Sequence, residues 1–157
     1  MDGGEPENNT ENNYTSKLRT VNEGQWAGWS YYPGGDPYED LAGPFYFRIT
    51  DGKPVCAFRA EHKHMNGGGF LHGGCVMTFA DFCLFVIARD AIQGSSTVTA
   101  TFNGEFVGTA RPGDLVECTG EVVKAGRSMV FVRGLITGPE GPVMSFSSVL
   151  KKIGKRA

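Results

Sequence analysis

The sequence lacks the features that mark several large classes of protein. Its 157 residues contain no Gly-x-Ser-x-Gly nucleophile motif, no phosphate-binding P-loop and no dinucleotide fingerprint. The formal charge is −2, so there is no basic excess for binding nucleic acid. The longest apolar run, from Cys75 to Ala88, is too short for a membrane span and contains Asp81. The N-terminus has neither the basic nor the apolar region of a secretory signal, so we expect a cytoplasmic protein.

The sequence also lacks a cysteine or histidine framework. The four cysteines form no Cys-x-x-Cys pair, and most lie in apolar segments where a free thiol behaves as a small hydrophobe. We expect reduced core thiols, with Cys118 partly exposed. The spacing of His62, His64 and His72 matches no common zinc site. The sequence therefore predicts no metal and no cofactor, with His62 and His64 exposed in a loop.

The composition changes along the chain divide it into three parts. Residues 1–13 are polar and are expected to form a disordered tail. Residues 14–44 read as an extension: Leu18 and Val21 have helical spacing, and a loop rich in aromatic residues, Gly and Pro follows. This loop is expected to pack on the domain, with a lid over a pocket as the alternative. Residues 45–157 form the main domain.

The main domain shows two strands, one long helix and four more strands. Phe45 to Ile49 and Pro54 to Glu61 are strands around an Asp51-Gly52 turn, and a helix runs from Gly73 to Ile92. Further strands span residues 96–107, 115–124, 128–137 and 143–153. In the first of these, alternation places Val98, Ala100, Phe102 and Phe106 on one face and Thr99 on the other. Tight turns make antiparallel neighbours, and a helix that is apolar all round must be enclosed. The pattern predicts an α+β fold in which an antiparallel sheet wraps around one central helix.

The stretch from Asn66 to Gly74 contains five glycines and one histidine directly before the long helix. Glycine leaves backbone N–H groups open, and the first N–H groups of a helix have no internal partner. Such groups could stabilise the oxyanion of a carbonyl under attack, which is worth about 3 kcal/mol or more. The equally acceptable alternative is that these glycines serve only close packing.

Asp81 is the only charged residue between His72 and Arg89. A buried carboxylate must be hydrogen-bonded or face water, so Asp81 is either a catalytic group or bonded to a nearby Thr or backbone N–H. It follows Gly74 by seven residues, roughly 10 Å along the helix, whereas attack on a carbonyl needs about 3–3.5 Å. If both features serve one reaction, Asp81 must come from a second subunit, and the active site lies at the interface of a two-fold dimer.

Taken together, Asn66, the glycines, Leu71-His72-Gly73-Gly74 and Asp81 resemble the signature of the thioesterase superfamily, in its branch similar to PaaI-type acyl-CoA thioesterases. The resemblance extends from about Phe45 to Ile153 and implies a hotdog fold. It also implies an acyl-CoA substrate and a homodimer that pairs into a homotetramer in many relatives.

The resemblance implies roles for individual residues at the helix start. Gly74, beside Gly73, would supply the main oxyanion N–H, and His72 would shape the loop. Asn66 would orient the thioester or the water. Asp81 would act as nucleophile or general base, two roles between which the family does not decide, and Thr99 would position water.

The resemblance also implies binding residues. The acyl group would lie in an apolar slot near Phe70, Leu71, Phe82 and Phe85. The CoA phosphates would meet Lys124 and Arg127 around the turn at Gly126 and Ser128, with Arg111 or Lys63 as further candidates. Each of these cations could equally be a solvated surface charge.

Other functions remain open at this point. The same fold could carry a hydratase or dehydratase of acyl thioesters, although the loop looks less like theirs. A protein that binds acyl-CoA without turnover is a second alternative, which Asp81 argues against. Cys75, near a helix N-terminus and His72, is a minor candidate nucleophile.

Overall fold

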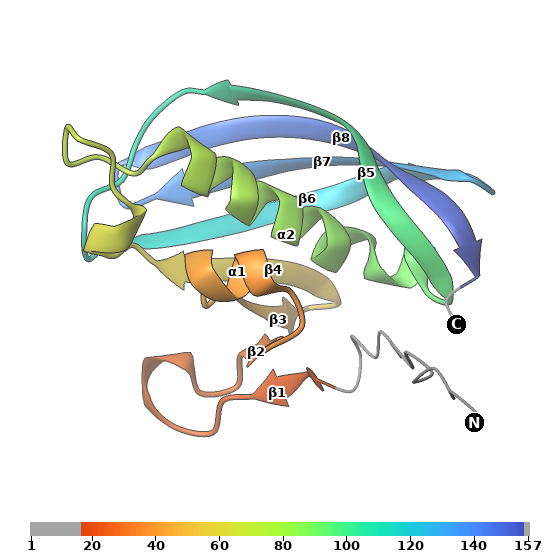
Figure 1. Ribbon diagram of the computed structural model, residues 1–157, viewed down its shortest axis with the longest axis horizontal. Coiled ribbons are helices and arrows are strands. Elements are labelled where there is room, and N and C mark those ends of the chain that lie inside the picture. Colours follow the sequence, from red (N-terminus) through yellow and green to blue (C-terminus); the bar gives the residue numbers. More distant parts are fainter. Residues whose placement is uncertain (1–16, 156–157) are drawn as a thin grey trace, which may run out of the picture.

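The computed structural model describes residues 17–155, which form one eight-stranded antiparallel sheet curved around a long helix (Figure 1). The strand order is β1-β2-β3-β4-β6-β7-β8-β5. The strands are β1 Arg19–Thr20, β2 Ser30–Tyr31, β3 Tyr46–Thr50, β4 Lys53–Arg59, β5 Ser95–Phe106, β6 Leu115–Ala125, β7 Met129–Gly138 and β8 Gly141–Lys155. The helices are α1 Pro37–Ala42 and α2 Gly73–Ile92, with short 3₁₀ turns at Gly24–Trp26 and His62–His64. This is the predicted hotdog arrangement.

The central helix α2 has the predicted bounds, Gly73–Ile92. Nine of its residues are buried, among them Phe79, Leu84 and Ala88, because the curved sheet covers most of its circumference. Burial of these apolar side chains supplies the main stabilising free energy of the domain. No helix among residues 17–155 is long and apolar enough to cross a membrane.

The hairpin predicted at Asp51-Gly52 is confirmed. Both residues have positive φ, 51° and 76°, as a two-residue turn between antiparallel strands requires. The turn sets the register of β3 on β4, in which Phe47 pairs with Cys56. Cys56, Cys83 and Cys118 are free and buried, and Cys118 is 1% exposed, so its predicted partial exposure was wrong.

The N-terminal extension differs from the sequence prediction. Residues 14–16 lie outside the described residues, and the expected helix near Leu18 is replaced by β1, which pairs with β2. The aromatic loop does pack on the domain, since Trp26 stacks on Tyr46 at 4.2 Å between ring centroids. Part of the expected loop is the helix α1, which begins after the cap Asp36 with a proline at its start.

Strand β5 departs from the simple alternation. Its register with β8 shifts between Thr99 and Thr101, which is a β-bulge. Thr99 contacts Asp81 on the helix side, whereas Val98 is 43% exposed and Phe102 packs against the core. The prediction that Val98 and Phe102 share a face was therefore wrong, because the extra residue reverses the alternation between them.

Candidate functional site

Asp81 lies in the middle of α2 and lines a cavity of about 370 Å³. Its side chain is half-buried, and its Oδ1 accepts a hydrogen bond from Thr99 Oγ1 at 2.6 Å. The alternative that Asp81 is bonded to a nearby threonine is therefore confirmed. The carboxylate also lines the cavity, and its catalytic role stays a prediction. A hydrogen bond to a carboxylate fixes its orientation and leaves the second oxygen free for another partner.

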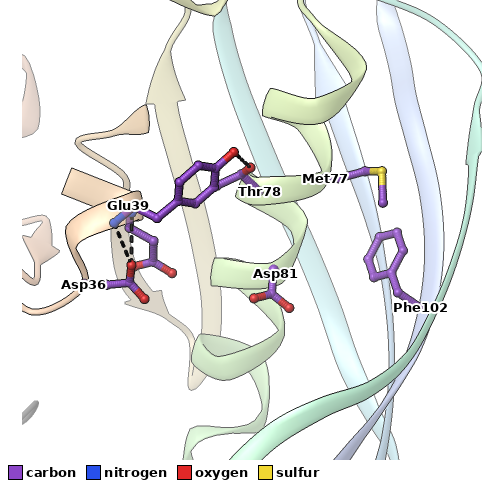
Figure 2. Close-up of a pocket in the computed structure, with 7 residues that line it drawn as sticks. Asp36, Glu39, Met77, Thr78, Asp81 and Phe102 are labelled. Atoms are coloured by element: carbon purple, nitrogen blue, oxygen red, sulfur yellow. Dashed lines mark hydrogen bonds between the residues drawn. The ribbon is translucent and has the colours of Figure 1, made fainter. Parts of the chain in front are cut away.

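The cavity has walls from three elements. Met77, Thr78 and Asp81 come from α2, Phe102 comes from β5, and the remaining lining residues, Asp36, Tyr38 and Glu39, come from α1 and its cap. Figure 2 shows Asp36 and Glu39 on one side of Asp81, and Met77 and Phe102 on the other. The Tyr38 hydroxyl lies 3.5 Å from Thr78 Oγ1, which itself donates to the Gly74 carbonyl at 2.9 Å.

The wall formed by Asp36, Tyr38 and Glu39 was not predicted from the sequence. Residues 36–39 were assigned to a loop, and their place beside Asp81 depends on contacts between segments about forty residues apart in the chain. Asp36 followed by Pro37 and by the acidic residues Glu39 and Asp40 is an N-cap pattern, and it could have revealed the helix.

The loop before α2 is organised by Asn66. Its Oδ1 accepts hydrogen bonds from the N–H groups of Gly68 at 2.9 Å and Phe70 at 3.2 Å. Its backbone N–H donates to the Phe70 carbonyl at 2.7 Å. Among residues 17–155, the side-chain NH₂ of Asn66 has no acceptor, so it can serve as a donor on an exposed loop. Asn66 therefore shapes the loop in the way an Asx turn does.

The start of α2 presents unpaired N–H groups, although not in the predicted arrangement. His72 is the N-cap, and its Nδ1 accepts a hydrogen bond from the Gly74 N–H at 2.8 Å. The expected donor Gly74 is thus already engaged. Within residues 17–155, the N–H groups of Gly73 and Cys75 have no hydrogen-bond partner. The Gly73 and Cys75 N–H groups are therefore both free donors at the helix terminus, where the helix dipole favours negative charge.

His64 supports this start of the helix and is not exposed as predicted. It is 4% exposed, its Nδ1 accepts from the Glu61 N–H at 2.9 Å, and its Nε2 bonds the Ala42 carbonyl at 2.7 Å. Because Nδ1 accepts, the proton of the neutral ring lies on Nε2. The His64 carbonyl accepts from the His72 N–H at 2.8 Å. His64 therefore joins the end of α1 to the cap of α2, while His62 is exposed as expected.

Cys75 is a poor nucleophile in this setting. Burial raises the pKa of its thiol to about 11, despite the nearby charge of Lys63. The thiol is therefore protonated at neutral pH, and a protonated thiol is not the reactive form.

The residues predicted to line the acyl slot lie in different environments and do not form one slot within a subunit. Phe82 is buried at 4% exposure and lies on a smaller hollow of about 100 Å³ with Tyr31, Tyr32 and Phe45. Leu71 is buried at 5% exposure, and Phe85 is partly buried against the core. Phe70 is covered by the guanidinium of Arg111 at 4.7 Å. None of these side chains lines the cavity at Asp81 within the described chain, where Met77 and Phe102 supply the apolar surface.

The residues predicted to bind CoA lie at the other end of the molecule from the helix start. The turn that holds Gly126, Arg127 and Ser128 joins β6 to β7, and the Ser128 carbonyl accepts from the Lys152 N–H at 2.8 Å. Lys152 pairs with Thr97 near the beginning of β5, which follows the C-terminus of α2 (Figure 1). Lys124 and Arg127 are exposed. Within one subunit, this turn and Gly73 therefore lie at opposite ends of α2.

The two other candidate cations are already in use within the chain. Lys63 donates hydrogen bonds to the Gly43 carbonyl and, at 3.5 Å, to the Leu41 carbonyl. Arg111 stacks over Phe70. Both contacts stabilise segments near the start of α2. Lys63 and Arg111 therefore have structural roles within the chain, beside any role in binding phosphates.

Solved structures share the fold of this chain, and curated proteins are similar to it in sequence. A Pseudomonas aeruginosa protein named "Putative esterase PA0474" is 36% identical over 72% of this chain and 86% of its own. Human acyl-coenzyme A thioesterase 13 is 29% identical over 51% of this chain, which spans 57% of the human protein. Two solved structures share the fold. The Escherichia coli PaaI protein has a TM-score of 0.66 at 20% identity over 76% of this chain and 86% of its own. A Streptococcus pneumoniae hypothetical thioesterase with coenzyme A has a TM-score of 0.63 at 23% identity over 72% of this chain and 88% of its own.

The family match covers the helix start, α2, the strands β5 to β7 and the first residues of β8. The thioesterase superfamily model matches residues 68–145, which include Gly73, Gly74, Asp81 and Thr99. The N-terminal extension and α1 lie outside this match. The family match, the hotdog architecture and the similarity to the Pseudomonas protein together show that the chain belongs to the thioesterase superfamily.

Proposed function

We propose that the protein is a thioesterase that hydrolyses an acyl-CoA to the free acid and the thiol. The observation that carries the proposal is the half-buried Asp81, oriented by Thr99 and open to a cavity on the central helix. A carboxylate held in this way suits either nucleophilic attack or activation of water. The human relative is named as an acyl-coenzyme A thioesterase, which supports the substrate class.

The chemistry needs a second group that stabilises the oxyanion. The unpaired Gly73 N–H at the start of α2 is suited to this role, and the Gly74 N–H could join it once His72 releases it. With Asp81 as base, water adds to the carbonyl carbon while its proton moves to the carboxylate, and the thiolate leaves on collapse of the tetrahedral intermediate. With Asp81 as nucleophile, the thiolate leaves first and water then hydrolyses the anhydride. The NH₂ of Asn66 would orient the thioester.

Asp81 and Gly73 are eight residues apart on one helix, roughly 12 Å, so they cannot serve one carbonyl within a subunit. The sheet offers a way to bring them together. β5 forms one edge of the described sheet, with β8 on one side and no strand of residues 17–155 on the other. An edge of twelve residues is suited to pairing with a second copy. We propose a homodimer joined through β5, with two active sites at its interface.

In this dimer, the turn around Arg127, which lies far from the helix start of its own subunit, would lie near the helix start of the partner. β5 runs opposite to α2, from the C-terminus of α2 back to its start (Figure 1). At that end, the Phe106 ring lies against Gly73. In a two-fold pair, the C-terminal end of one α2 faces the start of the other. Lys124 and Arg127 of one subunit would then approach the helix start of its partner and meet the CoA phosphates. The pneumococcal structure with coenzyme A supports CoA as a ligand of this fold.

The first test is release of free thiol from a panel of acyl-CoAs, with Asp81→Asn as the matched variant. We expect turnover by the native protein and a loss of about 10²–10⁴-fold in kcat for Asp81→Asn, the usual range for a general acid or base. Acyl-CoA binding should persist in this variant. Turnover that survives the substitution would overturn the role of Asp81, and absence of turnover on every acyl-CoA would overturn the proposed activity.

The oxyanion donor has its own test at Gly73. Proline is favoured at the first position of a helix and removes the N–H, and the extended ψ of 132° at His72 is compatible with a following proline. We expect Gly73→Pro to reduce kcat by about 10²-fold or more. Gly73→Ala keeps the N–H and adds the same first carbon beside Phe106, so it is the control. Equal activity of the two variants would exclude this N–H as the donor.

A further inference from the structure

The edge strand β5 contacts both halves of the proposed active site. In its first half, Thr99 Oγ1 lies 2.6 Å from Asp81 Oδ1. At its end, the Phe106 ring lies against the start of α2, where a Cβ added to Gly73 would be 3.3 Å from Phe106 Cζ. Asp81 of one chain and Gly73 of the other can serve one carbonyl only if Thr99 of one β5 lies opposite Phe106 of the second β5.

The span between these two positions can be measured on β8, which is hydrogen-bonded to β5 and does not carry its bulge. Thr99 pairs with Leu150, and Phe106 pairs with Met144. Leu150 and Met144 are six residues apart, or about 20 Å. The midpoint of this span is the position on β8 that pairs with Asn103. A two-fold axis at Asn103 therefore brings Thr99 of each chain opposite Phe106 of the other.

The symmetry of an antiparallel pair allows the axis to lie at this position. In a continuous sheet, opposite residues point to the same face, so an axis perpendicular to the sheet must pass where a residue faces its own copy. The even number of steps between the levels of Thr99 and Phe106 satisfies this condition. An odd number would have placed the axis between two residues that point to opposite faces.

The backbone of β5 presents suitable groups around Asn103. The Val107 N–H donates to the Val143 carbonyl on β8 at 2.9 Å. Because the backbone direction alternates along a strand, Asn103 also directs its N–H and C=O to β8, whereas Phe102 and Gly104 direct theirs to the free edge. In a pairing centred on Asn103, Phe102 faces Gly104 of the partner subunit. Each such pair can exchange two hydrogen bonds, and the axis generates the pair twice.

The side chains that would meet are also compatible. Thr101, Asn103 and Glu105 are exposed on the outer face, opposite to the core-packed Phe102. Glu105 would lie opposite Thr101 of the partner subunit, so like charges do not face each other. The two Asn103 amides would meet at the axis, where each can donate to the other. Phe106, which is 54% exposed in one subunit, would be covered by the second strand.

We propose that two copies of the chain pair through β5 in one register, with the two-fold axis at Asn103. The inference rests on the proposed function, because it uses the requirement that Asp81 and Gly73 of different chains act on one carbonyl. It assigns Asn103 as the residue that sets the register, as a polar residue facing its own copy does in other paired elements. It also adds Phe106 of the partner subunit to the surroundings of Asp81.

Disulfide cross-linking of the full chain tests the register without any need for turnover. Residues opposite each other on antiparallel strands have Cα atoms about 4.5–5.5 Å apart, within the range of a disulfide. Asn103→Cys should therefore link to its own copy in oxidised glutathione. Thr101→Cys and Glu105→Cys are matched controls on the same face, because each would lie about 14 Å from its own copy. The double variant Thr101→Cys/Glu105→Cys should link, since these two positions face each other.

The native chain is the blank, because three of its four cysteines are buried and burial raises the pKa of the fourth, Cys75, to about 11. We expect Asn103→Cys to form a covalent dimer on non-reducing electrophoresis at least about tenfold faster than either single control. The double variant should match it. Because the double variant keeps Asn103, it decides the register even if Asn103→Cys weakens assembly. Linked and reduced Asn103→Cys should hydrolyse acyl-CoA at equal rates.

Two results of the cross-linking would overturn the register. One is linking of Thr101→Cys or Glu105→Cys alone as fast as Asn103→Cys, and the other is a double variant that does not link. Loss of turnover when Asn103→Cys is linked would also overturn it, since the enforced pairing would not be the active one. Linking as expected without turnover of any acyl-CoA would instead overturn the proposed thioesterase function and leave the pairing through β5 in place.

Discussion

At the scale of single residues, the proposed chemistry depends on how Thr99 holds Asp81. The 2.6 Å bond from Thr99 Oγ1 fixes one carboxylate oxygen. We expect Thr99→Val, which keeps the shape and removes the donor, to lower kcat by about tenfold, in line with a lost hydrogen bond to a charged group. Thr99→Ser keeps the hydroxyl and should retain most of the activity. A Val variant as active as the Ser variant would show that the bond serves only packing, and thiol-release assays on both give the answer.

His64 makes the stability of the fold depend on pH. Burial lowers the pKa of its ring below the ordinary value of 6.5, partly offset by the bond to the Ala42 carbonyl. Between the lowered pKa and 6.5, the unfolded chain binds more protons at this residue than the folded chain does. The stability that neutral His64 contributes is therefore complete above about pH 6.5 and is lost as the pH falls through the folded pKa.

The measurement is the free energy of unfolding in denaturant at pH 7 and pH 5. His64→Asn retains an acceptor for the Glu61 N–H and does not titrate, so its loss of stability between the two pH values should be smaller than that of the native chain. His62→Asn changes an exposed histidine in the same turn and should leave the native pH dependence unchanged. If the free energy of unfolding fell equally between pH 7 and pH 5 for the native chain and for His64→Asn, His64 would not be the source of the pH dependence.

At the residue level, the local sequence singles out candidate residues whose roles stay predictions. Asp81 stands out because one charge interrupts an apolar helix, and Asn66 because its glycine neighbours leave N–H groups for its side chain. The burial of His64 and the occupancy of the Gly74 N–H could not be predicted, since one depends on α1 and the other on the ring orientation of His72. Only the structure therefore shows that the Gly74 N–H is engaged and that the Gly73 N–H is free.

At the scale of elements, the curvature of the sheet around α2 depends on glycines on facing strands. Gly120 on β6 pairs with Gly134 on β7. A Cβ added to Gly120 would lie 2.5 Å from the Arg133 carbonyl oxygen and 2.6 Å from Ile87 Cδ1 on α2. The strand can approach the helix so closely only because residue 120 has no side chain.

This close approach gives a prediction for stability. We expect Gly120→Ala to lower the free energy of unfolding by about 1–3 kcal/mol, the usual cost of overpacking. Gly154→Ala, on β8, meets no atom within 4 Å and should change it by about 0.5 kcal/mol or less. Denaturant titration of both variants is the measurement. Equal effects would mean that the sheet shifts to accommodate the new methyl group.

Elements were predictable to the extent that their signals are local. α2 has the predicted bounds because an apolar run lies between a glycine-rich start and Gly94. β1 and α1 were missed, since a two-residue strand exists only through its pairing with β2, and a six-residue helix is stabilised by contacts with the His62–His64 turn. The bulge in β5, which directs Thr99 toward Asp81, depends on the register with β8 and has no signal in the strand itself.

At the scale of the whole molecule, the two halves of the proposed site lie too far apart along α2 to act on one substrate. Asp81 lies mid-helix, the free Gly73 N–H lies at its start, and the turn around Arg127 lies beyond its end (Figure 1). The edge strand β5 runs alongside all three regions. A two-fold pairing at this edge would join complementary parts from two chains, which predicts that activity belongs to the dimer and falls when the dimer dissociates on dilution.

Mixing two inactive variants tests this arrangement directly. In a heterodimer of Asp81→Asn with Gly73→Pro, one interface site would combine the native Asp81 of one chain with the native Gly73 of the other, and the second site would lack both. Random reassembly of equal amounts gives heterodimers in about half of the dimers, each with one of two sites intact, so the mixture should recover about a quarter of the native activity. A site contained within one subunit would give no recovery, because every chain in the mixture carries one defect. The control mixture of Asp81→Asn with Asp81→Asn, treated identically, should remain inactive, and recovery in the mixed sample would show that Asp81 and Gly73 act across the interface.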